Sequence, residues 1–109
     1  MNDHVLDFKS LQFGVASAAT QIEGDETNTN WYRWYTQGKI HDNSSPDITD
    51  KHWELWKQDA LLMESLGIKY ARIGLEWARI EPKPHEFSLE ALKRYKEELE
   101  LLKSKNIKV

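Results

Sequence analysis

Apolar side chains recur at steps of three and four residues between Asp50 and Leu66, the spacing of one face of an α-helix. Thr49 and Asp50 both have side chains suited to cap the first turn. Gly67 suits the left-handed residue that commonly follows a helix. The pattern therefore predicts a helix over residues 50–66. Its apolar stripe consists of Trp53, Leu55, Trp56, Ala60, Leu62, Met63 and Leu66.

A second helical pattern begins after Ser88, whose hydroxyl suits an N-cap. Phe87 and Leu92 stand at the two positions of a hydrophobic staple. Lysines and glutamates occupy the positions between the apolar ones, and Asn106 suits the helix end. The predicted helix thus lies between Ser88 and Asn106. Its buried stripe consists of Leu92, Tyr95, Leu99 and Leu102.

Three segments have the pattern of strands. Leu11–Ala19 is small and apolar, which favours a strand flanked closely by other backbones. Ile68–Trp77 alternates, and Ile107–Val109 resembles the opening of a further strand. One face of the alternating segment carries Ala71, Ile73, Leu75 and Trp77, and the other carries Arg72, Gly74 and Glu76. We expect Arg72 and Glu76 to form an ion pair inside a barrel; a surface pair on an edge strand is the alternative.

The remaining segments are predicted to connect these elements. Asp25–Asn30 is polar and rich in turn-forming residues, and Gln37–Asp47 has the same character. Trp31–Tyr35 fits a short helical turn. Pro82 and Pro84 mark another loop. The elements therefore follow the order strand, loop, helix, strand, helix and the first residues of a strand.

Alternating strands and helices predict parallel strands joined by crossover helices. An open doubly wound sheet usually has a glycine-rich phosphate turn after its first strand, but here residues 18–24 contain no such motif. Arg72 and Glu76 on one strand face also disfavour an open sheet, whose inner strands are apolar on both faces. Polar strand residues are common near the carboxyl-end rim of a barrel. A barrel is therefore favoured.

Composition and charge exclude several classes of protein. The net charge is -3 and the chain has no cysteine, which disfavours a nucleic-acid partner and excludes disulfide or thiolate metal sites. The four histidines lack the spacing of a metal motif, so we expect no metal. No apolar run approaches the roughly 20 residues that span a bilayer, and the first residues lack the features of a secretion signal. We expect a cytoplasmic protein without a membrane partner.

Three ordered motifs resemble family 1 of the glycoside hydrolases, the β-glucosidase and 6-phospho-β-glucosidase family. Residues 11–24, LQFGVASAATQIEG, are similar to its N-terminal signature, and residues 59–68, DALLMESLGI, to its first barrel helix entering the second strand. Residues 72–82, RIGLEWARIEP, are similar to its motif Arg-x-x-x-x-Trp-Ser-Arg-Ile-x-Pro. The chain departs from the family at Leu11, Thr20, Asp25 and Ala78, and its loop at residues 25–30 is shorter.

The resemblance implies an α/β fold, the N-terminal part of a (β/α)8 TIM barrel. This part comprises about strands 1–2, helices 1–2 and the start of strand 3. It also implies a retaining mechanism, in which two carboxyl groups about 5 Å apart act as nucleophile and acid/base. Family members carry these glutamates in Asn-Glu-Pro and Glu-Asn-Gly motifs, and neither motif occurs in this sequence. We therefore expect residues 1–109 to be a partial domain, truncated at its C-terminus and inactive alone.

Two residues match supporting groups of the family's site. Gln21 corresponds to the glutamine that hydrogen-bonds sugar hydroxyls, for which an amide that both donates and accepts is suited; a loop-capping amide is the alternative. Arg72 corresponds to the arginine beside the nucleophile, where a guanidinium keeps a carboxylate ionised and oriented. Glu23 and Glu76 are expected to be structural rather than catalytic.

The five tryptophans are expected mainly to pack, with Trp77 facing the helices. Trp31 and Trp34, beside the entrance loop, are minor candidates for sugar contact.

The leading functional hypothesis is that the parent protein hydrolyses small β-glucosides, β-galactosides or their 6-phosphates, without a cofactor. The alternative from another class is a relative of the same fold that binds sugar or protein without catalysis. A complete small protein is disfavoured, because two strands and a stub leave sheet edges unpaired. The sequence does not indicate an oligomeric state.

Overall fold

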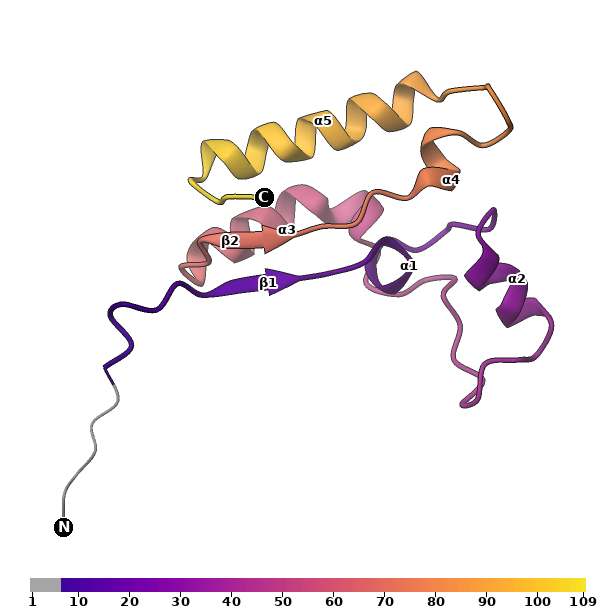
Figure 1. Ribbon diagram of the computed structural model, residues 1–109, viewed down its shortest axis with the longest axis horizontal. Helices are drawn as coiled ribbons and strands as arrows, with labels where there is room; N and C mark the ends of the chain where they lie inside the picture. Colours follow the sequence, from indigo (N-terminus) through magenta and orange to yellow (C-terminus); the bar gives the residue numbers. More distant parts are fainter. Residues whose placement is uncertain (1–6) are drawn as a thin grey trace, which may run out of the picture.

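The computed structural model describes residues 7–109, in which two parallel strands lie side by side (Figure 1). Strand β1 (Gly14–Ala16) pairs with β2 (Tyr70–Arg72) in parallel. Lys108 extends the ladder on the other side of β2: its amide donates to the Lys69 carbonyl at 2.9 Å, and its carbonyl accepts from the Ala71 amide at 2.8 Å. The predicted third strand is therefore confirmed as a parallel bridge at Lys108.

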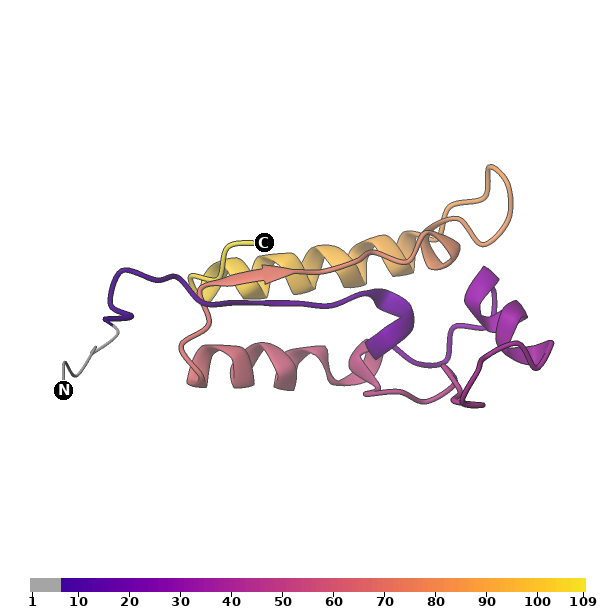
Figure 2. The same cartoon turned by 60° about the horizontal axis from the view of Figure 1, so that its bottom comes forward.

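Two long helices run antiparallel to the strands (Figure 2). They are α3 (His52–Ser65) and α5 (Leu89–Ser104), and they contact each other. Ala71 of β2 packs against both, whereas the next residue, Arg72, is exposed, as the alternation of strand side chains requires. The buried core cluster consists of Ala60, Ala71, Leu102 and Ile107.

The carboxyl ends of β1 and β2 point toward the three short helices. These are α1 (Ala19–Ile22), α2 (Asn30–Thr36) and α4 (Trp77–Ile80). Figure 1 shows all three, with their loops, at the same end of the molecule. The prediction of a short helical turn near Trp31 is confirmed by α2. No helix in the described part of the chain is both long and apolar enough to cross a membrane.

Three of the four predicted helix boundaries are confirmed, among them Asn106, which follows the end of α5 with a φ of 57°. The Ser88 hydroxyl accepts the Ala91 amide at 3.1 Å as the N-cap of α5, and Gly67 follows α3 with a φ of +72°. The predicted cap at Thr49 or Asp50 is wrong. Lys51 occupies the N-cap position with a φ of 53° and makes no capping hydrogen bond through its side chain. The helix therefore begins at His52, two residues later than expected.

Both predicted strands are longer than the observed ones. The chain leaves the first strand to form α1 from Ala19, and it leaves the second to form α4 from Trp77. Glu76 is the N-cap of α4, since its carboxylate accepts the Ala78 amide at 3.3 Å. The predicted Arg72–Glu76 ion pair is absent among residues 7–109. Trp77, predicted to face the helices, is 62% exposed.

The helical stripes are only partly buried. Trp56 and Ala60 of α3 and Tyr95 and Leu102 of α5 are buried as predicted. The stripe predictions are wrong for Leu62, Leu66 and Leu92, which are exposed in this structure.

Candidate functional site

A cavity of about 740 Å³ lies at the carboxyl ends of the two strands. This volume is within the range of small-molecule sites. One wall comes from α1 and the residue before it, a second from α2 and the loop that follows, and a third from the chain after β2. The lining residues are Ala18, Ala19, Thr20, Gln21, Asn30, Trp31, Ile40, Ser44, Ser45, Pro46, Thr49, Gly74, Leu75 and Glu76.

Gly74 allows the first and third walls to approach each other. A Cβ at this position would lie 3.3 Å from the Ala19 nitrogen and 3.4 Å from the Ala18 Cα. Any larger side chain would therefore press on the backbone that leads into α1. Backbone close approach of this kind is a common reason for glycine at a site.

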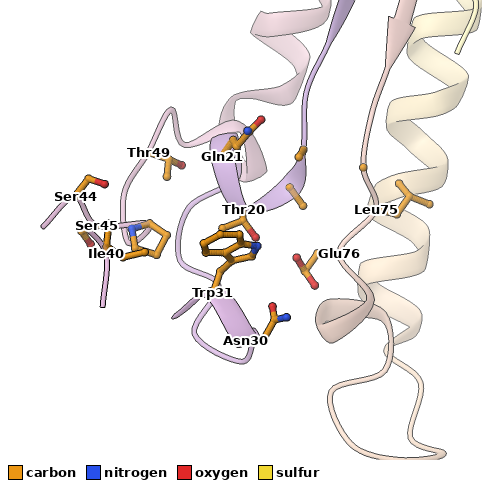
Figure 3. Close-up of a pocket in the computed structure, with 14 residues that line it drawn as sticks. Thr20, Gln21, Asn30, Trp31, Ile40, Ser44, Ser45, Thr49, Leu75 and Glu76 are labelled. Atoms are coloured by element: carbon orange, nitrogen blue, oxygen red, sulfur yellow. The ribbon is translucent and has the colours of Figure 1, made fainter. Parts of the chain in front are cut away.

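The polar lining groups include an amide and a carboxylate. In the view of Figure 3, the Trp31 ring lies beneath Thr20, and Glu76 faces it from the opposite wall. The amide of Gln21 extends away from the Trp31 ring in the same view. Gln21 and Trp31 are both exposed, so each is accessible to a ligand. An indole face with the Asn30 amide and the Glu76 carboxylate nearby suits a polyhydroxylated ligand.

Arg72 lies at the end of β2, in register with Ala16 at the end of β1. Gln21 therefore follows one strand end and Arg72 closes the adjacent one, as expected for two residues near one rim. However, the structure does not bring them into the same cavity. Arg72 helps to line a second, smaller cavity of about 330 Å³ between the strands and α3. The roles assigned to Gln21 and Arg72 stay predictions.

Glu23 belongs to a buried cluster just after the α1 turn, and it is only 3% exposed. Its carboxylate accepts the Arg79 Nε at 2.8 Å and the Tyr95 hydroxyl at 2.7 Å. Burial raises the pKa of Glu23, and the hydrogen bonds from Tyr95 and Arg79 only partly oppose this. These contacts to Arg79 and Tyr95 agree with the expectation that Glu23 is structural rather than catalytic.

Tyr95 connects this cluster to the cavity wall that follows β2. Its hydroxyl donates to Glu23 and accepts the backbone amide of Glu76 at 2.9 Å. Burial, followed by the hydrogen bond to Glu23, raises the pKa of Tyr95, so the hydroxyl keeps its proton at neutral pH. The helical periodicity indicates only that Tyr95 belongs to an apolar stripe, and it gives no signal for this polar function.

Two guanidinium groups contact the Trp53 ring. Arg79 is 4.1 Å and Arg94 is 4.6 Å from the Trp53 ring centroid, distances typical of cation–π contact. The ring also meets Tyr95 edge-on, with centroids 5.3 Å apart and an interplanar angle of 74°. Trp53 therefore packs the cluster, as expected for a tryptophan on the helix stripe.

A second buried polar cluster joins α3 to α5. His52 contacts Asp59 through Nδ1 at 2.6 Å and Glu98 through Nε2 at 2.7 Å, while Arg94 pairs with the other oxygen of Glu98. Sequence reasoning missed the cluster. The spacing of Arg94 and Glu98, four residues apart on a helix, was the available signal.

The loop after α1 is fixed by its backbone. Gly24 has a φ of +73°, and a Cβ there would lie 2.3 Å from the Ile48 carbonyl oxygen. The Asp25 amide donates to the Asp47 carbonyl at 2.7 Å, and the Trp53 amide donates to the Glu23 carbonyl at 3.2 Å. The chain that leaves α1 is thus held against both the loop before α3 and the start of α3 itself.

Comparison with known proteins identifies the family. The sequence model of glycosyl hydrolase family 1 matches residues 7–109, nearly the whole chain. The chain belongs to glycosyl hydrolase family 1. Gln21 and Arg72 both lie within the matched range.

The relatives are mainly β-glucosidases. The chain is 40% identical over 81 residues to "Beta-glucosidase 47" of Arabidopsis thaliana, covering 69% of this chain and 15% of that protein. It is 39% identical over 77 residues to "Probable inactive beta-glucosidase 14" of Oryza sativa subsp. japonica, covering 65% of this chain and 15% of the relative. The chain thus spans about 15% of the length of these relatives.

Solved structures agree with the predicted fold class. A family 1 β-glucosidase from Thermotoga maritima superposes with a TM-score of 0.80 at 29% identity, covering 88% of this chain and 23% of that one. The AHE enzyme from Alicyclobacillus herbarius gives 0.79 at 32% identity, covering 88% and 23%. The neighbours are TIM barrels, so β1, β2 and the bridge at Lys108 correspond to part of a (β/α)8 barrel. The predicted fold class is confirmed.

Proposed function

We propose that this chain forms the first part of a retaining β-glycosidase that hydrolyses small β-glucosides, β-galactosides or their 6-phosphates. The observation that carries the proposal is the family match over residues 7–109 together with a cavity at the strand carboxyl ends that contains Gln21. Catalytic sites of TIM barrels are built at this face. A small-molecule glycoside is the proposed ligand; no cofactor, nucleic acid or membrane is invoked, and the proposed location is cytoplasmic.

In this proposal the chain supplies binding and orientation rather than the reacting carboxylates. Gln21 hydrogen-bonds hydroxyl groups of the sugar, and Arg72 orients and ionises the nucleophile contributed by another part of the protein. Hydrolysis with retention requires two carboxyl groups in fixed positions, one as nucleophile and one as acid/base. Because the sequence contains neither glutamate motif, we expect residues 1–109 alone to be inactive.

The test uses the protein that contains this chain. Purified protein is incubated with nitrophenyl β-glucoside, nitrophenyl β-galactoside and their 6-phosphates, and product anomers are followed by NMR from the first turnovers. We expect turnover with a β-configured first product. The isolated 109-residue chain, assayed in parallel, is expected to release no nitrophenol. A first product of inverted configuration would overturn the retaining mechanism.

A non-catalytic sugar-binding or protein-binding relative is the second candidate. One observation favours it, namely that a rice relative at 39% identity carries "inactive" in its name. The coding sequence of the parent protein distinguishes the two, because a catalyst needs both glutamate motifs. Sugar binding without turnover by the intact protein would support this second candidate.

A further inference from the structure

Two walls of the candidate sugar cavity share one hydrogen-bonding group that lies outside the cavity. The Tyr95 hydroxyl, on α5, donates to Glu23 at 2.7 Å and accepts the Glu76 backbone amide at 2.9 Å. Glu23 follows Gln21 by two residues, and Glu76 itself lines the cavity. Tyr95 is only 3% exposed and is not among the lining residues.

The first wall needs such an external support. Helix α1 comprises four residues, and its N-cap, Ala18, makes no capping hydrogen bond through its side chain. A single helical turn is not stable by itself, because the cost of nucleation exceeds the gain from its few hydrogen bonds. The position of Gln21 therefore depends on contacts made by neighbouring residues.

Those contacts converge on Glu23. Its amide donates to the Ala19 carbonyl at 2.9 Å, which closes the turn, and its carboxylate binds Tyr95 and Arg79. Arg79 also donates to the Gly24 carbonyl. Because Arg79 belongs to α4 and Tyr95 to α5, the end of α1 is attached to two elements that follow β2 in the chain.

The third wall, formed by the chain after β2, depends on the same hydroxyl. The Glu76 amide stands at the start of α4, where the first amides of a helix have no partner within the helix. Tyr95 accepts this amide, while the Glu76 carboxylate accepts the Ala78 amide at 3.3 Å. One hydroxyl thus sets the backbone position at the entrance of α4 and at the exit of α1.

We propose that Tyr95 is a positioning residue for sugar binding, whose hydroxyl sets the separation between the Gln21 turn and the Glu76 wall. The inference rests on the proposed function insofar as the ligand of the cavity is a glycoside. Tyr95 acts through Glu23 and through the Glu76 backbone, without contact to the sugar. Its replacement by phenylalanine removes both hydrogen bonds and keeps the ring that packs on Trp53.

The test compares Tyr95→Phe with Tyr70→Phe in the protein that contains this chain. Tyr70 lies in β2 and does not line the cavity, so its substitution removes the same atom elsewhere. Binding of glucose is measured by calorimetry and kcat and KM on nitrophenyl β-glucoside by kinetics. Hydrogen exchange reports on the amide of Glu76.

We expect Tyr95→Phe to raise the glucose Kd and the KM about tenfold, which corresponds to one well-formed hydrogen-bond pair. The Glu76 amide should exchange faster, and Tyr70→Phe should leave Kd and KM unchanged. If the role of Tyr95 were purely structural, Tyr95→Phe would lower the melting temperature and the fraction of active protein. The variant would then have a lower kcat and an unchanged KM. Unchanged Kd and KM in Tyr95→Phe would therefore overturn the inference.

Two further outcomes of this experiment are distinguishable. If Tyr95→Phe does not fold, Glu23→Met replaces it, since this change removes the oxygen that accepts the Tyr95 hydroxyl and keeps the length of the side chain. Arg79→Met, which removes the other partner of Glu23, is its control. We expect a larger rise in Kd for Glu23→Met than for Arg79→Met, and equal Kd values overturn the inference. Glucose binding without turnover in the unaltered protein rejects hydrolysis, and the Kd comparison then decides the role of Tyr95. An unaltered protein that neither binds nor cleaves β-glucosides, β-galactosides or their 6-phosphates overturns both proposals.

Discussion

The imidazole of His52 on α3 and the carboxylate of Glu98 on α5 contact each other at 2.7 Å in the interior between the two helices. Burial disfavours the charged imidazole, but the hydrogen bonds to Glu98 and Asp59 outweigh it and raise the pKa of His52. Burial likewise disfavours the Glu98 carboxylate, yet His52 and Arg94 lower the pKa of Glu98. The contact between α3 and α5 is therefore strongest when His52 is charged and Glu98 is ionised.

The first prediction concerns pH. A histidine with a raised folded-state pKa contributes stability fully below its unfolded value of about 6.5, and this contribution is lost as pH rises through the folded value. In urea unfolding of the protein that contains this chain, His52→Asn should lower the free energy of unfolding more below pH 6.5 than well above it. His41→Asn, on an exposed loop, is the control and should show no such difference. An equal cost of His52→Asn at both pH values contradicts the prediction.

The second prediction concerns the buried ion pair of Glu23 and Arg79. Arg79→Ala leaves the Glu23 carboxylate buried without its cationic partner, which typically costs about 3–5 kcal/mol. Lys96→Ala breaks the exposed pair with Glu100, where the Lys96 side chain is 75% exposed, and should have no measurable effect. Urea unfolding curves measure both. A cost for Arg79→Ala as small as that for Lys96→Ala would show that the pair is unimportant.

The third prediction compares two glycines with similar backbone conformations. Gly24 and Gly38 have φ values of +73° and +67°, but only Gly24 would place a Cβ against other atoms, 2.3 Å from the Ile48 carbonyl oxygen. Gly38→Ala should cost roughly 1 kcal/mol through left-handed strain alone. Gly24→Ala should cost at least about 2 kcal/mol more because the backbone must move. Thermal unfolding of both variants provides the comparison, and equal losses would contradict it.

The fourth prediction tests the role assigned to Arg72. Arg72→Met in the parent protein should lower kcat about a hundredfold, the usual scale for removing one preorganised charge from an active site. The melting temperature should change little, because Arg72 is exposed in this structure. Arg33→Met on α2, also exposed, is the matched control. If Arg72→Met keeps its kcat, the assigned role is wrong.

Much of the fold was predictable because it depends on local signals. The periodicity of α5, its Ser88 cap and the left-handed Gly67 are encoded by neighbouring residues and match the structure. The alternation of strands and helices was sufficient to predict parallel pairing. The strand ends were not predictable from alternation, because Leu75 and Trp77 continue the apolar pattern while the backbone already turns into α4.

The candidate site was predictable only in part. Motif resemblance identified Gln21, and it lines the cavity. The bridging role of Tyr95 depends on Glu23, 72 residues away in sequence, and the His52–Glu98 contact joins residues 46 apart. Such pairs follow from how α3, α4 and α5 pack, which no local pattern specifies. The start of α3 was not predictable from a local pattern either, because Lys51, in a left-handed conformation, occupies the N-cap position that the sequence favours for Thr49 or Asp50.

The distribution of the Glu23 cluster over the chain matters for protein engineering. Its members come from the exit of the first strand, from α4 and from α5, so they are far apart in sequence. A chimera that takes residues up to Gly24 from one homologue and the following helices from another would combine partners that were never selected together. The geometry on which the cavity depends is preserved when the crossover is placed after residue 95. It is also preserved when Glu23, Arg79 and Tyr95 are exchanged together.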